Sequence, residues 1–144
     1  MSSTFVASRT WKLRSLLAIT LALPALLFMS SIPADAQSRT VVRFSAGASA
    51  THLNGKITGP EYKDYVLGAR AGQTLDVVLK PDAAFFNILP PGSNDTAIYI
   101  GSMDGNHASV VLPQSGDYTI RVYQMGNAKD TNRKRTFDLS IRID

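Results

Sequence analysis

The sequence predicts an all-β protein whose fold is an antiparallel β-sandwich of about eight strands. Three observations support this fold class. Apolar and polar residues alternate with a period of two over most of the chain after residue 40, as expected for half-buried strands. Residues that favour turns separate these runs at a spacing of roughly ten residues. After residue 40, no stretch sustains the 3.6-residue apolar repeat of an amphipathic helix.

The alternation is clearest in the last predicted strand, where Phe137, Leu139, Ile141 and Ile143 alternate with polar residues. The same pattern recurs in five earlier segments: 65–67, 75–79, 98–100, 110–112 and 118–122. One face of each strand is therefore apolar and the other polar. This arrangement favours two sheets packed face to face around one core.

Turn-forming residues lie between the predicted strands. They occur at 59–60, 71–73, 90–92, 104–106 and 115–117. The pair Asp104-Gly105 predicts a hairpin that links strand 98–101 to strand 109–112. Segment 126–134 is polar and basic, and we expect a solvated hairpin loop there. This loop either keeps a sheet edge soluble or forms part of a binding surface.

Residues 1–36 are expected to be a removable signal peptide. Three basic residues precede the apolar stretch 16–29, and Ala34 and Ala36 are the small residues before a cut at Gln37. The apolar stretch is shorter than the ~20 residues of a membrane-spanning helix. The chain has no cysteine, so no lipid can be attached at the cut. We therefore expect one exported, soluble domain, residues 37–144, with no membrane anchor after cleavage.

The composition of residues 37–144 argues against nucleic-acid partners and against catalysis. Twelve Lys and Arg stand against ten Asp and Glu, and no series of aromatic residues accompanies the basic ones, as single-strand binders require. His52 and His107 are far apart in the sequence, and neither has a nearby histidine or carboxylate at ligand spacing. No metal site, cofactor or catalytic residue is predicted, and the protein is expected not to be an enzyme.

Segment 115–125 concentrates polar and aromatic residues that are typical of protein-binding surfaces. Tyr118 is expected to face the core, whereas Arg121 and Tyr123 share the opposite face of their strand. Arginine and tyrosine are enriched at binding hot spots. Two alternatives assign structural roles instead: Tyr118 as a corner tyrosine bonded to backbone, and Arg121 as the partner of Asp138 across a hairpin.

Several segments resemble the periplasmic inhibitors of goose-type (g-type) and invertebrate-type lysozymes. The segments are EYKDYVL and ARAGQT within 61–74, FNILPPGS at 86–93 and GDYTIRVYQM at 116–125. The resemblance implies a β-sandwich that pushes a loop into the lysozyme active-site cleft. The recurring Ser-Gly-x-Tyr turn of that family corresponds here to Ser115, Gly116, Asp117 and Tyr118.

The resemblance also implies roles for individual residues. Ser115 and Tyr118 would bond to polar and acidic groups of the lysozyme cleft. Arg121 would engage a catalytic carboxylate, and Tyr123 would pack beside it. If Tyr118 faces the core, it supports the loop instead of touching the enzyme.

The second half of the domain also resembles pre-peptidase C-terminal domains. Two functions therefore follow: a lysozyme inhibitor of the periplasm, or a non-catalytic envelope module that binds glycan or protein. A homodimer formed through an edge strand is a further alternative that the sequence leaves open.

Overall fold

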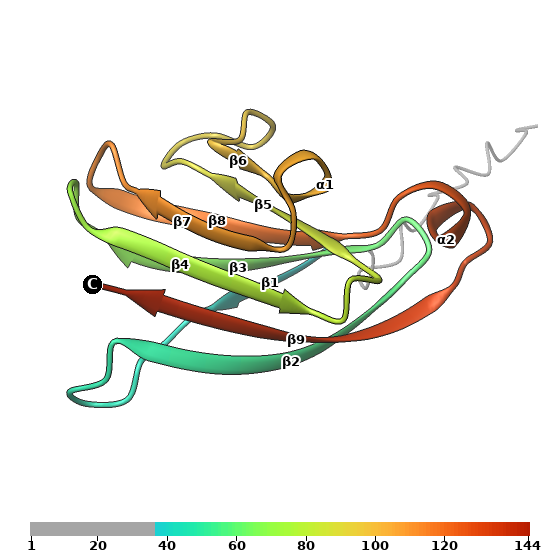
Figure 1. Ribbon diagram of the computed structural model, residues 1–144, viewed down its shortest axis with the longest axis horizontal. Helices are drawn as coiled ribbons and strands as arrows, with labels where there is room; N and C mark the ends of the chain where they lie inside the picture. Colours follow the sequence, from blue (N-terminus) through green and yellow to red (C-terminus); the bar gives the residue numbers. More distant parts are fainter. Residues whose placement is uncertain (1–36) are drawn as a thin grey trace, which may run out of the picture. The chain divides into compact units, whose positions relative to one another are not determined.

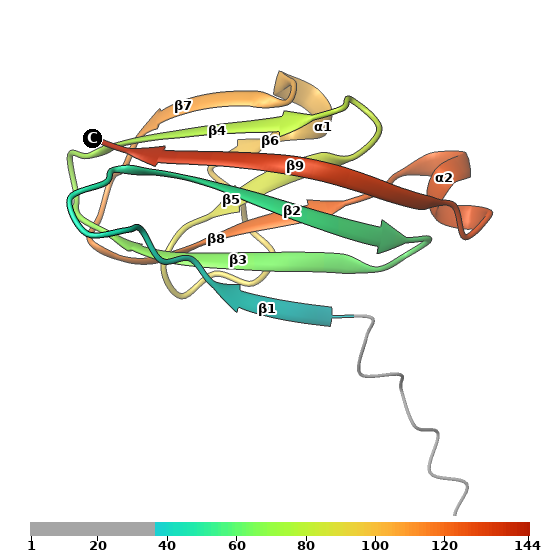
Figure 2. The ribbon, with the colours of Figure 1, turned by 90° about the horizontal axis from the view of Figure 1, so that it is seen from below.

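The computed structural model describes residues 37–144 of the chain. The predicted signal peptide, residues 1–36, lies outside the described residues. The described part forms nine strands and two short helices. Figures 1 and 2 show the strands in two stacked layers.

The two layers are a five-stranded and a four-stranded sheet, which we call sheet A and sheet B. Sheet A has the order β1 (Gln37–Val41), β3 (Tyr62–Ala69), β8 (Gly116–Tyr123), β5 (Phe85–Leu89) and β6 (Tyr99–Ile100). Sheet B has the order β2 (Ala50–Thr58), β9 (Lys134–Ile143), β4 (Thr74–Lys80) and β7 (His107–Val111). All pairings are antiparallel except that of β1 with β3, which is parallel. The predicted β-sandwich is confirmed.

The core lies between the sheets and follows the predicted alternation. Tyr118, Ile120 and Val122 of β8 are fully buried, and Leu75, Val77 and Leu79 of β4 meet them from the other sheet. The rings of Tyr65 and Phe137 pack edge to face at 6.2 Å. Burial of this apolar surface is the main favourable contribution to folding in a domain without disulfides.

The prediction of a hairpin at Asp104-Gly105 is wrong. Strand β6 belongs to sheet A and β7 to sheet B, and helix α1 (Gly101–Asp104) connects them. The Tyr99 ring stacks on the Phe86 ring at 5.4 Å, and its hydroxyl lies within hydrogen-bond distance of the carbonyls of Asp104, Gly105 and His107. These contacts hold the chain as it passes from one sheet to the other.

The basic segment 126–134 is solvated as predicted, but it is not a hairpin loop. It joins β8 of sheet A to β9 of sheet B and contains helix α2 (Gly126–Asp130). Before it, the buried Gln124 donates hydrogen bonds to the carbonyls of Arg133 at 2.8 Å and Gly59 at 3.4 Å. This amide ties the two ends of the segment to the β2–β3 turn.

A loop between β5 and β6 covers part of the outer face of sheet A (Figure 1). Val66, Leu89 and Thr119 point away from the core, yet only 5%, 2% and 9% of their surfaces are exposed. The loop reaches this face through Asn94, whose carbonyl accepts a hydrogen bond from Arg121. Sheet B has no such cover over its outer face within the described residues, where His52, Asn54, Lys56 and Asp138 are exposed.

Candidate protein-binding surface

The structure places the predicted site residues in two regions of strand β8. Ser115 and Gly116 form the turn that leads into the strand. Arg121 and Tyr123 lie near its other end, roughly 20 Å away for a strand rising ~3.3 Å per residue. Tyr118 lies between them with its side chain in the core.

The Ser115-Gly116 turn is held by contacts from neighbouring segments. The Ser115 hydroxyl accepts a hydrogen bond from the amide of Ala71 at 3.0 Å. Gly116 has φ of 146°, and a Cβ atom there would lie 2.7 Å from Cγ of Pro91. Only glycine fits this backbone conformation and this close approach without strain.

Tyr118 adopts the corner arrangement that was one of the two alternatives. Its ring is fully buried, and its hydroxyl donates to the carbonyl of Gln114 at 2.6 Å and accepts from the Gln114 amide at 3.3 Å. The side chain therefore ties the approach to the Ser-Gly turn onto the core. In this arrangement the Tyr118 side chain stabilises the Ser-Gly turn from the core side.

Arg121 is fixed on the outer face of sheet A. Its Nε and Nη2 each donate to one oxygen of Asp64 at 2.8 Å, and Nη1 donates to the Asn94 carbonyl at 3.0 Å. The guanidinium carbon lies 4.1 Å from the centroid of the Tyr62 ring. The predicted alternative partner, Asp138, is wrong, because Asp138 lies on sheet B and bonds to Asn54.

The guanidinium keeps two N–H groups that no described residue accepts, one on each Nη atom, because it has five donors in all. The hydrogen bond to Asp64 raises the pKa of Arg121, and burial opposes this effect by lowering the pKa. The Coulombic attraction of the Asp64 carboxylate also raises the pKa. A permanently charged and oriented donor pair therefore lies at the protein surface.

Tyr123 and its neighbours line a hollow of about 430 Å³ beside Arg121. The Tyr123 hydroxyl lies 3.0 Å from Oδ1 of Asn87 and 3.3 Å from Oγ of Ser102. Met125, 49% exposed, and Lys129 also line the hollow. The hollow thus offers aromatic and thioether surface next to two basic groups, one of which Asp64 neutralises.

The β5–β6 loop joins the turn and the hollow into one surface. Pro91 contacts Gly116 at one end of the loop, and Asn94 bonds to Arg121 further along. We call the surface formed by the Ser115-Gly116 turn, loop residues 91–94 and the Arg121–Tyr123 hollow the sheet A binding surface.

Sequence reasoning gave no role to Tyr62, Asp64 or Asn94. Tyr62 and Asp64 stand two residues apart in EYKDYVL, so they share the outer face of β3, and Asp64 pairs in register with Arg121. The alternation of β3 and β8 assigns Asp64 and Arg121 to the outward faces of their strands. Only the order of the strands in the sheet shows that the two residues are neighbours. Asn94 acts through its backbone carbonyl, for which no sequence signal exists.

The outer face of sheet B carries the two histidines, and a cavity lies beside them. His52, Ser140, Val78 and His107 align in register across the sheet, and His52 Nδ1 lies 2.8 Å from the Ser140 hydroxyl. The two histidines are three strand spacings apart, roughly 14 Å, which is too far to share a metal ion. Residues 37–144 contain no group of three metal-ligating side chains.

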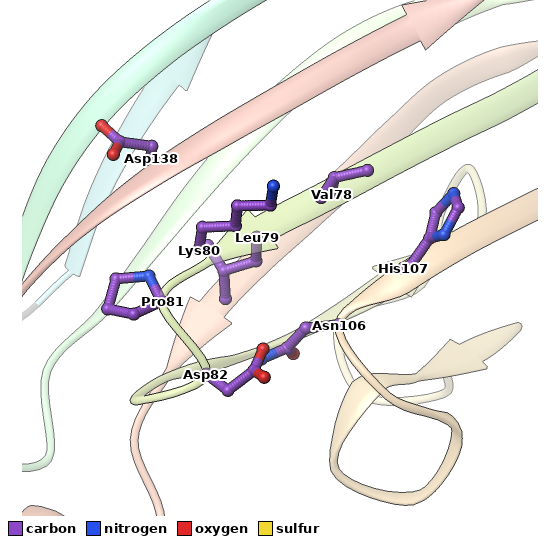
Figure 3. A pocket seen from close by; sticks show the side chains of 8 residues that line it. All are labelled: Val78, Leu79, Lys80, Pro81, Asp82, Asn106, His107 and Asp138. Atoms are coloured by element: carbon purple, nitrogen blue, oxygen red, sulfur yellow. The ribbon is translucent and has the colours of Figure 1, made fainter.

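A cavity of about 970 Å³ lies nearby, at the end of β4. Figure 3 shows Lys80, Asp82, Asn106, His107 and Asp138 around it. They come from β4 and the segment that follows it, from β7 and the residue before it, and from β9. No helix in the described part of the chain is long and apolar enough to cross a membrane.

The fold and the surface around Arg121 define a class of protein: a β-sandwich whose sheet A carries an ordered arginine and tyrosine surface. Comparison with known proteins identifies the family within this class. The inhibitor of g-type lysozyme from Escherichia coli K12 is 30% identical over 105 residues, which cover 71% of this chain and 78% of that protein. The chain belongs to this family of inhibitors of g-type lysozyme. No protein-family model matches the chain.

Solved structures agree with this assignment. The periplasmic inhibitor of g-type lysozyme from Aeromonas hydrophila superposes with a TM-score of 0.71 at 32% identity, covering 75% of this chain and 97% of that one. The corresponding inhibitor from Salmonella Typhimurium gives 0.63 at 29% identity, with 74% and 98% covered. The protein is therefore a periplasmic member of the family and is not an enzyme.

Proposed function

We propose that this protein inhibits a g-type lysozyme by covering its active-site cleft with the sheet A binding surface. Membership of the inhibitor family carries this proposal, because the family relatives are named as inhibitors of g-type lysozyme. The alternative, an envelope module like the pre-peptidase C-terminal domains, has weaker support. The inhibitor acts by stoichiometric binding, without turnover.

The chemistry of the surface suits a glycosidase cleft. Enzymes that cleave glycosidic bonds generally use a pair of carboxyl groups, and the two remaining N–H groups of Arg121 can donate to one of them. Tyr62 and Tyr123 supply apolar area and directed hydrogen bonds of the kind found at hot spots. In this proposal Ser115 and Gly116 contact the rim of the cleft, and Tyr118 holds their turn in place.

The size of the surface is compatible with one partner. A standard interface buries ~800 Å² on each side, which corresponds to a patch ~30 Å across. A single lysozyme can therefore cover both the Ser115-Gly116 turn and the hollow.

The test is inhibition of a g-type lysozyme acting on cell walls, with protein purified from the periplasm. We expect inhibition to be complete at an equimolar ratio. Arg121→Ala should weaken binding by at least about 1 kcal/mol, roughly fivefold in the inhibition constant. Arg142→Ala is the matched control, because Arg142 also pairs with a carboxylate, Asp144 at 2.6 Å, but lies on sheet B.

Two results would contradict the proposal. The first is an absence of inhibition of goose-type, invertebrate-type and chicken-type lysozymes at micromolar concentration. The second is an equal loss of inhibition in Arg121→Ala and Arg142→Ala, which would show that inhibition does not depend on the sheet A binding surface.

We also propose that residues 1–36 are removed on export and that residues 37–144 are the mature domain. The described residues of strand β1, Gln37–Val41, all follow the predicted cut, so cleavage there retains them. The intact mass of the protein from the periplasm tests this proposal. A mature protein that begins after Val41 would contradict it, because it would lack β1.

A homodimer through an edge strand is a separate proposal. Strand β2 is the longest strand at a sheet edge, with nine residues and one unpaired side, and such edges can pair with another chain. Light scattering on the purified protein decides between a monomer and a dimer.

A further inference from the structure

A basic pocket lies on the side of the sandwich where the edge strands of the two sheets come together. Its volume is about 350 Å³, and its lining residues are Ser38, Lys56, Thr58, Glu61, Lys63 and Lys134. Strand β1 is the edge of sheet A and β2 is the edge of sheet B. Figure 2 shows both strands on this side of the molecule. The pocket is separate from the hollow at Arg121 and from the cavity at the end of β4.

Strand register sets a lysine beside a hydroxyl in both sheets. Ser38 of β1 pairs with Lys63 of β3 in sheet A. Thr58 of β2 pairs with Lys134 of β9 in sheet B. Lysine and hydroxyl residues from both sheets therefore line one pocket.

The charges of the pocket are not balanced by the protein. Three lysines stand against one carboxylate, Glu61, and Oε2 of Glu61 already accepts a hydrogen bond from the Thr58 amide at 2.8 Å. None of the three lysines forms a salt bridge within residues 37–144, where the ion pairs are Arg121–Asp64 and Arg142–Asp144. The pocket carries a net charge of about +2, and like charges held close together are unfavourable.

The protection of sheet edges from pairing with other chains explains only some of the three lysines in the pocket. Lysines on edge strands discourage pairing with other chains, and Lys56 and Lys134 are exposed in that way. Lys63 differs, because it is half-buried and lies on the same side of β3 as the core residues Tyr65 and Leu67. A half-buried lysine without a carboxylate in a salt bridge indicates that the pocket is suited to an external anion.

We propose that this pocket binds a phosphate group. A phosphomonoester carries about −1.5 to −2 charges at neutral pH, which matches the net charge of the pocket. Lysine ammonium groups bind phosphate as point charges, and three lysines line the pocket. The phosphate comes either from inorganic phosphate or from a lipid headgroup, since both present the same tetrahedral oxygens.

The test is an NMR titration of protein purified from the periplasm with inorganic phosphate at constant ionic strength. We expect saturable shifts of the amides of Ser38, Thr58 and Lys63, with a dissociation constant of about 1 mM. Lys63→Gln should raise this constant by at least about tenfold. Lys134→Gln should also weaken binding. Because Lys134 is exposed, this variant serves as the test if Lys63→Gln fails to fold.

The matched control is Lys80→Gln. It removes the same charge from the outer face of sheet B, and we expect it to leave the dissociation constant unchanged within about twofold. Shifts that do not saturate, or equal weakening by the control variant, would overturn the proposal, because either result indicates general attraction to a basic protein.

Vesicle sedimentation identifies the source of the phosphate. Retention on phosphatidylcholine vesicles that contain phosphatidic acid, but not on pure phosphatidylcholine, and release by inorganic phosphate indicate a lipid headgroup. Saturable binding of inorganic phosphate without vesicle retention indicates free phosphate. Binding of neither would overturn the proposal. Because Lys63 lies outside the sheet A binding surface, inhibition of lysozyme by Lys63→Gln should equal that of the unmodified protein.

Discussion

The fold itself holds Arg121 in one orientation. Asp64 accepts from two of its nitrogens, Asn94 from a third, and Tyr62 covers one face of the guanidinium. A free arginine side chain loses up to ~2 kcal/mol of rotamer entropy when it is immobilised. Here the fold has already fixed the side chain, so less of this entropy is lost on binding.

Asp64 should therefore act through Arg121. We expect Asp64→Asn to weaken lysozyme inhibition in the unmodified protein but to have little effect in an Arg121→Ala background. The coupling energy between the two positions should be about 1 kcal/mol. Inhibition constants of the four proteins in the cycle measure it. An equal loss in both backgrounds would mean that Asp64 contacts lysozyme directly.

Tyr65 should make the domain less stable in alkali. Burial raises the pKa of Tyr65 above its ordinary value of 10.0, and only 5% of the residue is exposed. Above pH ~10 the unfolded chain loses this proton while the folded protein keeps it, so the free energy of unfolding falls until the higher folded pKa is passed. Denaturant unfolding of Tyr65→Phe should show a smaller fall with pH. The same pH dependence in both proteins would contradict the expectation.

At the scale of elements, the Ser115-Gly116 turn depends on three neighbouring segments. Ala71 bonds to Ser115, Pro91 packs on Gly116, and the Tyr118 hydroxyl ties the backbone of Gln114 to the core. The turn is therefore a rigid part of the surface, and its shape depends on the β3–β4 turn and the β5–β6 loop.

Gly116→Ala should disturb this turn. The new Cβ would collide with Pro91, and φ of 146° is a conformation that alanine rarely adopts, so we expect a loss of about 1–3 kcal/mol in the free energy of unfolding. Gly68→Ala is the control, because the nearest atom to its Cβ, an oxygen of Asp117, would be at 3.5 Å, an ordinary contact. Denaturant titration measures both variants. Equal losses would show that the close approach to Pro91 is unimportant.

Alternation in the sequence located six of the nine described strands, β3, β4 and β6 to β9. It marked neither β1, β2 nor β5, and it could not fix the connections between strands. Asp104-Gly105 is a strong local hairpin signal, yet the partner of the next strand is set by distant contacts such as the stacking of Tyr99 on Phe86. The sequence does indicate that the β5–β6 loop buries part of the outer face of sheet A. Tyr65, Val66 and Leu67 are consecutive apolar residues, a pattern that indicates burial on both faces of a strand.

The candidate surface was predicted in part for the same reason. Arg121 and Tyr123 were assigned to one outward face from the alternation of a single strand. Asp64 and Tyr62 complete the site only because β3 lies next to β8, which is a property of the whole sheet.

At the scale of the whole molecule, the two outer faces differ in character. Sheet A is half covered by the β5–β6 loop and presents aromatic side chains around a fixed arginine. Sheet B is open and polar, with histidines, lysines and carboxylates interspersed. The proposed partner therefore has one suitable face to bind.

Net charge should contribute little to association with lysozyme. Residues 37–144 hold twelve basic and ten acidic residues, so long-range steering is weak and binding rests on local complementarity at the sheet A binding surface. We expect the association rate constant to change by less than about threefold between low and physiological salt. Surface plasmon resonance at several ionic strengths measures this rate. A fall of about tenfold or more would show that a local charged patch, rather than the shape and hydrogen bonds of the hollow, directs the encounter.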